Sequence, residues 1–172
     1  MTVSNLNVPA FPDPRLNCER KTKTHDIRCR DPFVMLAGDV YYLYRSRNGK
    51  IECLTSLDLN LWSEPIVVFD PPADFYGCDQ FFWAPECHYY DGNFYIFTSC
   101  KSGKTGTRRI SVYRASTPLG PFAEITKGGI TPAAWDAIDG TLWFENDIPY
   151  MVFVHEWTNM PDHIGSFVAA PL

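Results

Sequence analysis

The sequence has no long hydrophobic run and no excess of positive charge, and each absence excludes a class of protein. No stretch of the 172 residues approaches the ~18 consecutive apolar residues that a membrane-spanning helix needs. Fifteen Lys and Arg face 20 Asp and Glu, a net charge of -5. The chain therefore lacks the basic footprint of proteins that bind nucleic acid or anionic membranes. A neutral substrate fits this balance better.

Signal-peptide and metal-binding cysteine patterns are also missing. Residues 1–5 have neither a basic nor an apolar segment, so we expect a cytoplasmic chain as written, or a secreted one if a leader was trimmed. The cysteines show no C-x-x-C spacing and no zinc-like spacing to histidine. We favour mostly buried free thiols in a reducing compartment, with three disulfides as the alternative. The six are Cys18, Cys29, Cys53, Cys78, Cys87 and Cys100.

What the chain does contain is a repeat of three β-hairpin patterns, at residues 30–44, 83–97 and 138–154. In each, β-branched and aromatic runs flank a turn rich in Gly, Asn or Asp. Third strands are expected at residues 51–56, 110–115 and 164–169, and fourth strands at 66–69 and 122–125, reached through connecting stretches at 61–65 and 118–121. Fourteen prolines and the lack of a helical period exclude a helical fold.

Four antiparallel strands per unit, repeated every ~54 residues, predict an all-β fold of propeller blades. The W-D signature of WD40 repeats is absent, and one double glycine does not make a kelch pattern. We expect an N-terminal arm at 1–27 and blades at about 28–72, 80–127 and 135–172, the last incomplete. Because propellers close with ~4–8 blades, about two and a half to three blades indicate the N-terminal part of a longer protein or a truncated product.

One acidic residue opens each hairpin: Asp31, Glu86 and Asp139 recur 55 and then 53 residues apart. In a propeller the innermost strands surround one axis, so these side chains are expected to converge. Singly, each could be a strand start or a turn residue. Together, paired carboxylates in a cleft indicate glycoside hydrolysis.

These motifs resemble glycoside hydrolase family 43, through R-D-P-F at 30–33, W-A-P-E-C-H-Y-Y-D-G at 83–92 and I-D-G-T-L at 138–142. The resemblance implies a five-bladed propeller that cleaves arabinose- and xylose-containing glycans with inversion. It makes Asp31 the general base and Asp139 the residue that orients the acid and raises its pKa. The acid itself is expected in a following blade, beyond Leu172, so the chain alone should be nearly or wholly inactive.

The same resemblance places Trp83, Ala84 and Ile138 on the wall of the sugar pocket, with Trp83 either stacking on a sugar or packing in the core. Glu86 is expected to hydrogen-bond near the axis. No cofactor and no metal are expected. His155 could approach an axial metal site but is interpreted as a structural histidine. A carbohydrate is the expected partner, without nucleic acid or membrane, and the oligomeric state stays open.

Two alternatives remain. The R-D-P at 30–32 and E-C at 86–87 also resemble retaining fructosidases of family 32, in which Glu86 would be the acid/base. The N-D-P-N nucleophile motif of that family is absent, because the arm has only F-P-D-P at 11–14. The other alternative is a non-catalytic glycan-binding propeller, which the 15% aromatic content also suits.

Overall fold

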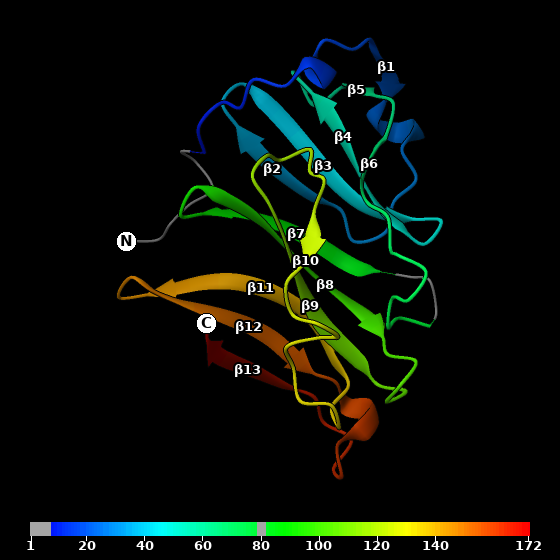
Figure 1. Cartoon of the computed structure of the whole chain (residues 1–172), viewed down its shortest axis with the longest axis vertical. Coiled ribbons are helices and arrows are strands. Elements are labelled where there is room, and N and C mark those ends of the chain that lie inside the picture. The colour runs from blue at the N-terminus through cyan, green and yellow to red at the C-terminus, as the bar shows by residue number, and fades with distance from the viewer. Residues whose placement is uncertain (1–7, 79–81) are drawn as a thin grey trace.

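The computed structural model describes residues 8–78 and 82–172, and in this part the chain forms three successive antiparallel sheets (Figure 1). Residues 1–7 of the expected arm lie outside the described residues. Helical structure here is limited to three short 3-10 turns, η2 (Pro14–Leu16), η3 (Thr24–Asp26) and η4 (Trp157–Asn159). None of the described helices has the length and apolar character to cross a membrane. The all-β prediction is confirmed.

The first sheet has the strand order β1-β5-β4-β3-β2, and β6 pairs with β4 beside β5. Part of the segment expected as an arm, β1, joins this sheet through β5. The strand β5 lies where a connecting stretch was predicted, and that prediction is wrong because Trp62 is buried and orders the segment. The bounds are β1 Arg20–Lys23, β2 Phe33–Ala37, β3 Val40–Arg47, β4 Lys50–Ser56, β5 Leu61–Ser63 and β6 Ile66–Phe69.

The second and third sheets have the orders β10-β9-β8-β7 and β11-β12-β13. The strand β10 is only two residues long, against four expected, and β13 begins two residues later than predicted, after Gly165. The bounds are β7 Trp83–Tyr90, β8 Asn93–Lys101, β9 Arg108–Ala115, β10 Ala123–Glu124, β11 Ala137–Glu145, β12 Ile148–His155 and β13 Ser166–Pro171.

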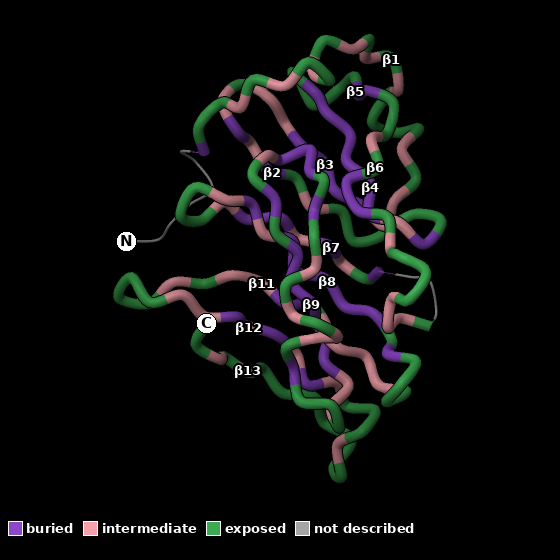
Figure 2. Tube along the Cα trace, viewed as in Figure 1, coloured by how far each residue is buried: buried purple, intermediate pink, exposed green. Residues whose placement is uncertain are grey.

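The middle sheet packs against both of its neighbours. On β8, Phe94 and Ile96 face the core shared with the first sheet, whereas Phe97 faces the core shared with the third. This alternation follows from the two-residue period of a strand. Burial is accordingly concentrated in the central strands of the first two sheets, and β13 is the least covered (Figure 2).

The first strand of each hairpin is an edge strand of its sheet, as the propeller prediction requires. The three edge strands are β2, β7 and β11, and β7 contacts both of the others. Their amino-terminal ends therefore bring distant parts of the sequence together.

All six cysteines lie in the described part, and none forms a disulfide, which confirms the preference for thiols. Cys53, Cys87 and Cys100 are buried, Cys18 and Cys29 are half-buried, and Cys78 is exposed. Burial raises the pKa of the Cys87 thiol to about 12. Cys87 is therefore a core residue and not a nucleophile.

Candidate active site

A left-handed residue stands at the start of each innermost strand: Asp31 (φ 51°), Ala84 (φ 44°) and Asp139 (φ 55°). Asp31 precedes β2, while Ala84 and Asp139 coincide with shifts in the β7–β8 and β11–β12 register. Such bulges change the direction in which a side chain points. The left-handed conformation costs energy for a non-glycine residue, and outside turns such strained residues cluster at functional sites.

This geometry corrects the predicted repeat. Glu86 was expected at the position of Asp31 and Asp139, but the residue in that backbone conformation is Ala84. Glu86 lies two residues further along β7, past the bulge. The second blade thus has a methyl group where the other two have a carboxylate.

Gly140 allows the third blade to make this turn beside a tightly packed neighbour. A Cβ atom at Gly140 would lie 2.9 Å from Cγ2 and 3.0 Å from Cδ1 of Ile110 on β9. Real side chains do not approach so closely without displacement. The Asp-Gly pair therefore serves two needs, a left-handed carboxylate and a close contact between sheets.

The charge environment of Asp139 shows that acids from different sheets converge there. Partial burial raises the pKa of Asp139, and the negative charges of Asp31, Glu86 and Glu156 raise it further. Like charges within reach disfavour the ionised form. Asp31 and Glu86 therefore lie within electrostatic range of Asp139, although the three come from three different sheets.

Glu156 is a member of this cluster that the sequence did not reveal. It follows β12, and its N–H donates to the carbonyl of Asp136 (2.7 Å). Because Ala137 pairs with His155, Glu156 lies at the same end of the third sheet as Asp139. Only the pairing of β11 with β12 places Glu156 near Asp139, and a single sequence does not reveal which residues of two strands pair.

Glu86 is held by its neighbour on the same face of β7. Its Oε2 lies 3.2 Å from Nε2 of His88, which is 8% exposed and packs against the rings of Phe33 and Phe97. The hydroxyl of Thr141 on β11 lies 3.5 Å from the same nitrogen. Glu86 is thus anchored beside the axis.

A cavity of about 350 Å³ opens beside Asp31. This is within the size range of small-molecule sites, ~300–1,000 Å³. It combines one carboxylate with an indole and a small wall residue, whereas Ile138, Glu86 and Asp139 are not among its lining residues. The lining residues are Arg30, Asp31, Ser46, Phe82, Trp83 and Ala84.

Trp83 is 36% exposed and is therefore not a core residue. The guanidinium carbon of Arg108 lies 3.3 Å from the centroid of its ring, and the Thr98 hydroxyl donates to its carbonyl (2.8 Å). A cation over one ring face fixes the indole and leaves the other face for stacking. Arg108 was not singled out from the sequence, because its partner lies on a strand two positions away in the sheet.

The remaining candidates lie outside this cavity. Ile138 is half-buried and pairs with Val154. His155 stacks on Trp135 at a centroid distance of 4.0 Å, and its Nε2 lies 3.0 Å from Oδ1 of Asn159. Residues 8–78 and 82–172 contain no group of three or more side chains suited to a metal ion. His155 does not fit a ligand role, and the absence of a metal stays a prediction.

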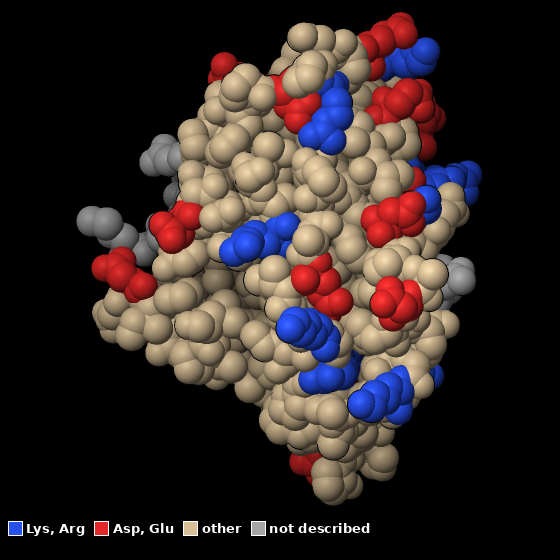
Figure 3. Space-filling view, viewed as in Figure 1, with Lys and Arg blue, Asp and Glu red and all other residues tan. Residues whose placement is uncertain are grey.

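The surface around these strands carries both charge signs. On the face shown in Figure 3, basic and acidic side chains of the described residues alternate without a large patch of either sign.

Comparison with known proteins identifies relatives for most of the chain. The family model for glycosyl hydrolases family 43 matches residues 25–170. An alpha-L-arabinofuranosidase 43 from Humicola insolens is 32% identical over 96 residues, which are 52% of this chain and 19% of that protein.

Solved structures show the same relationship. An endo-arabinase from Bacteroides thetaiotaomicron is 33% identical with a TM-score of 0.80, covering 90% of this chain and 54% of that one. An endo-1,4-beta-xylanase from the same organism is 27% identical with a TM-score of 0.64, covering 91% and 50%. The chain thus spans about half the length of these structures. The neighbours are five-bladed propeller enzymes, which confirms the predicted fold class.

Proposed function

Because the chain belongs to glycosyl hydrolases family 43, we propose that it carries the base side of an inverting glycosidase site for arabinose- and xylose-containing glycans. The observation that supports this most strongly is that Asp31 and Asp139, from the first and third blades, both stand in the left-handed conformation at the start of an innermost strand and lie within electrostatic range of each other. Asp31 also lines a sugar-sized cavity with Trp83. Inverting hydrolysis needs a carboxylate of this kind to activate water.

Asp31 acts as the general base in this proposal. It is exposed, so water reaches it, and Arg30 Nε lies 3.5 Å from its Oδ2. The apolar face of a pentose stacks on the ring face of Trp83 that Arg108 does not cover. The anomeric carbon is then presented to a water molecule held by Asp31.

Asp139 orients the general acid and raises its pKa in this proposal. Burial raises the pKa of Asp139 most, and the negative charges of Asp31, Glu86 and Glu156 raise it further. The same field would keep a nearby carboxylic acid protonated near neutral pH.

No residue of the 172 is assigned as the general acid. Glu86 is engaged with His88, and Glu156 accepts a hydrogen bond from the Thr158 hydroxyl (2.9 Å). Both carboxylates are engaged in these contacts, so neither is assigned this role. We therefore expect very slow hydrolysis by this chain of substrates whose leaving group needs protonation.

An activated substrate tests this assignment. A 2,4-dinitrophenyl arabinofuranoside or xyloside leaves without protonation, so the chain should cleave it slowly, with inversion visible by proton NMR. Asp31→Asn should abolish that cleavage. The Bacteroides endo-arabinase, assayed on arabinan in parallel with this chain, is the positive control for the unactivated substrate. Equal turnover of arabinan by both proteins would refute the missing-acid argument.

The two alternatives give different results in the same assay. A retaining fructosidase would release the retained anomer, and on an unactivated fructoside its Glu86→Gln variant would be inactive, because that leaving group needs the proton of Glu86. A non-catalytic glycan-binding module would bind arabinoxylan without cleaving even the activated substrate.

A further inference from the structure

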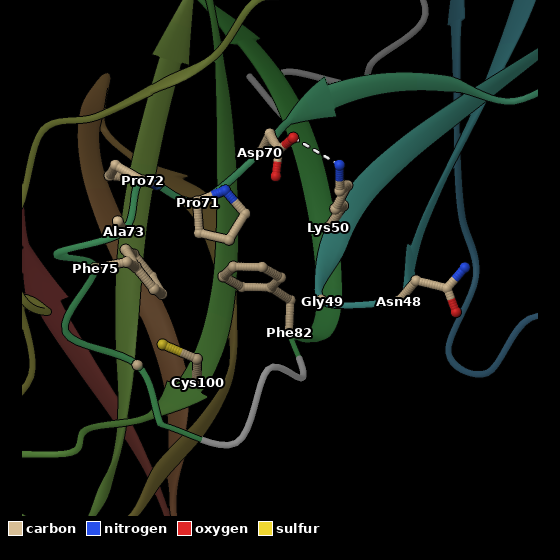
Figure 4. A pocket seen from close by; sticks show the side chains of 11 residues that line it. Asn48, Gly49, Lys50, Asp70, Pro71, Pro72, Ala73, Phe75, Phe82 and Cys100 are labelled. Carbon is tan, nitrogen blue, oxygen red and sulfur yellow. Dashed lines mark hydrogen bonds and ion pairs between the residues drawn. The ribbon is translucent and has the colours of Figure 1, made fainter.

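A second cavity lies between the first two sheets, next to the cavity that contains Asp31. It has a volume of about 340 Å³ and is formed where the β3–β4 turn approaches the segment after β6 (Figure 4). Phe82 lines both cavities, and its N–H donates to the hydroxyl of Ser46, another residue of the first cavity (3.2 Å). The two cavities are therefore neighbours that share Phe82 in their linings.

The floor of the second cavity is aromatic and apolar. The rings of Phe75 and Phe82 lie 5.6 Å apart at 54°, and Pro71 closes the wall above Phe82 (Figure 4). Phe82 is 4% exposed and also packs on Phe69, so the floor is fixed by the core beneath it. The half-buried ring of Phe75 is the accessible part of this floor, and it suits the C–H face of a sugar ring.

The rim carries an ion pair. Lys50 Nζ and Asp70 Oδ2 are 2.6 Å apart, and the two side chains are 39% and 58% exposed. Because the charges neutralise each other, the rim does not select an anion or a cation. The ammonium keeps hydrogens to donate, and the second carboxylate oxygen can accept. Two adjacent sugar hydroxyls, one as acceptor and one as donor, match this arrangement.

We propose that this second cavity is a subsite for a further neutral pentose unit of the glycan whose reacting unit occupies the Asp31 cavity. The proposal rests on the function proposed above and extends it: the chain should select oligosaccharides over single sugars through Lys50 and Asp70. A purely structural ion pair between β4 and the end of β6 would stabilise the sheet slightly and would not affect ligands.

The test is a titration of the isotopically labelled 172-residue chain, followed by amide NMR. The probes are L-arabinose, α-1,5-arabinotriose, D-xylose and β-1,4-xylotriose. One trisaccharide should bind about tenfold more tightly than its monosaccharide, because hydrogen bonds to charged groups are added. It should shift amides near Lys50 and Asp70 in addition to those near Asp31.

Asp70→Ala should weaken trisaccharide binding by about tenfold and leave the monosaccharide affinity unchanged. Asp70→Asn, which preserves the shape, should give a smaller loss and guards against misfolding of the alanine variant. Glu19→Ala removes the acid of another exposed ion pair, Lys21–Glu19 (3.3 Å), and should change neither affinity.

The outcomes separate the two proposals. If neither monosaccharide shifts the amides near Asp31, the proposed function fails. If a monosaccharide binds there but neither trisaccharide binds more tightly, the subsite is refuted. If Asp70→Ala weakens both ligands equally, Asp70 acts on the fold and the subsite is also refuted.

Discussion

Replacing Gly140 by alanine tests how the third blade presents Asp139. Gly140 does not have a positive φ, so alanine is not excluded by the backbone. The new Cβ would lie 2.9 Å and 3.0 Å from two carbons of Ile110, which is fully buried and β-branched. Such a stiff side chain in a packed core cannot move away cheaply.

The magnitude follows from two opposing effects. Overpacking of this kind costs ~1–3 kcal/mol. Losing the flexibility of glycine in the unfolded chain gains ~0.4–1 kcal/mol. We expect Gly140→Ala to lower the free energy of unfolding by about 1–2 kcal/mol.

The effect of Gly140→Ala on the free energy of unfolding should change sign when the Ile110 side chain is truncated. Ile110→Ala alone costs ~2–5 kcal/mol through the cavity that it leaves. In that background the atoms that oppose Gly140→Ala are gone, so the second substitution should stabilise the chain by ~0.4–1 kcal/mol. Urea denaturation of the four proteins, followed by tryptophan fluorescence, gives the coupling energy.

Gly92→Ala is the matched control. Gly92 has φ 76°, and no atom lies within 4 Å of the position that a Cβ would take there, so its cost is backbone strain alone. That cost should be the same in the parent chain and in the Ile110→Ala background. If Gly140→Ala is equally destabilising in both backgrounds, the close contact with Ile110 does not control this part of β11.

Three other predictions follow from the site and the core. Because the pKa of Asp139 is raised in the folded state, its carboxyl ionises first in the unfolded chain. As pH increases above ~3.8, the parent should therefore lose stability that Asp139→Asn keeps, so the difference between their free energies of unfolding should grow. Urea denaturation measures this difference, and a difference that does not depend on pH would contradict the prediction. Arg108→Met and Trp83→Leu, combined in a double-mutant cycle of unfolding free energies, should give a coupling energy of ~0.5–1 kcal/mol for the cation–π contact. Cys78 should react with a thiol reagent in the native chain and Cys87 only on unfolding, as followed by mass spectrometry.

The blades were predictable because their signals are local. Alternating β-branched and aromatic residues with Asp-Gly or Asn-Gly turns are enough to define hairpins such as β7–β8. The strands β1 and β5 were missed because each is short and depends on the other. They pair through Thr22 and Trp62, a contact 40 positions apart that no local pattern encodes.

The site was predictable only in part, for the same reason. Asp31 and Asp139 stand in motifs that a repeat makes visible, and the structure brings them together. Glu156 and Arg108 act through strand register and through packing across a sheet. Their distance along the sequence from the motifs does not indicate that they lie near Asp139 and Trp83, so the folded structure was needed to identify them.

The difference between Ala84 and its two counterparts reduces the negative charge beside the proposed sugar cavity. Three left-handed positions surround the axis, and a carboxylate at each would place three like charges around the ligand. Ala84 instead lines the cavity with a methyl group between Asp31 and Trp83. The acid of the second blade, Glu86, is displaced by the bulge and held by His88. The bulge in β7 thus places a methyl group at the cavity wall while keeping the charge of Glu86 within electrostatic range of Asp139.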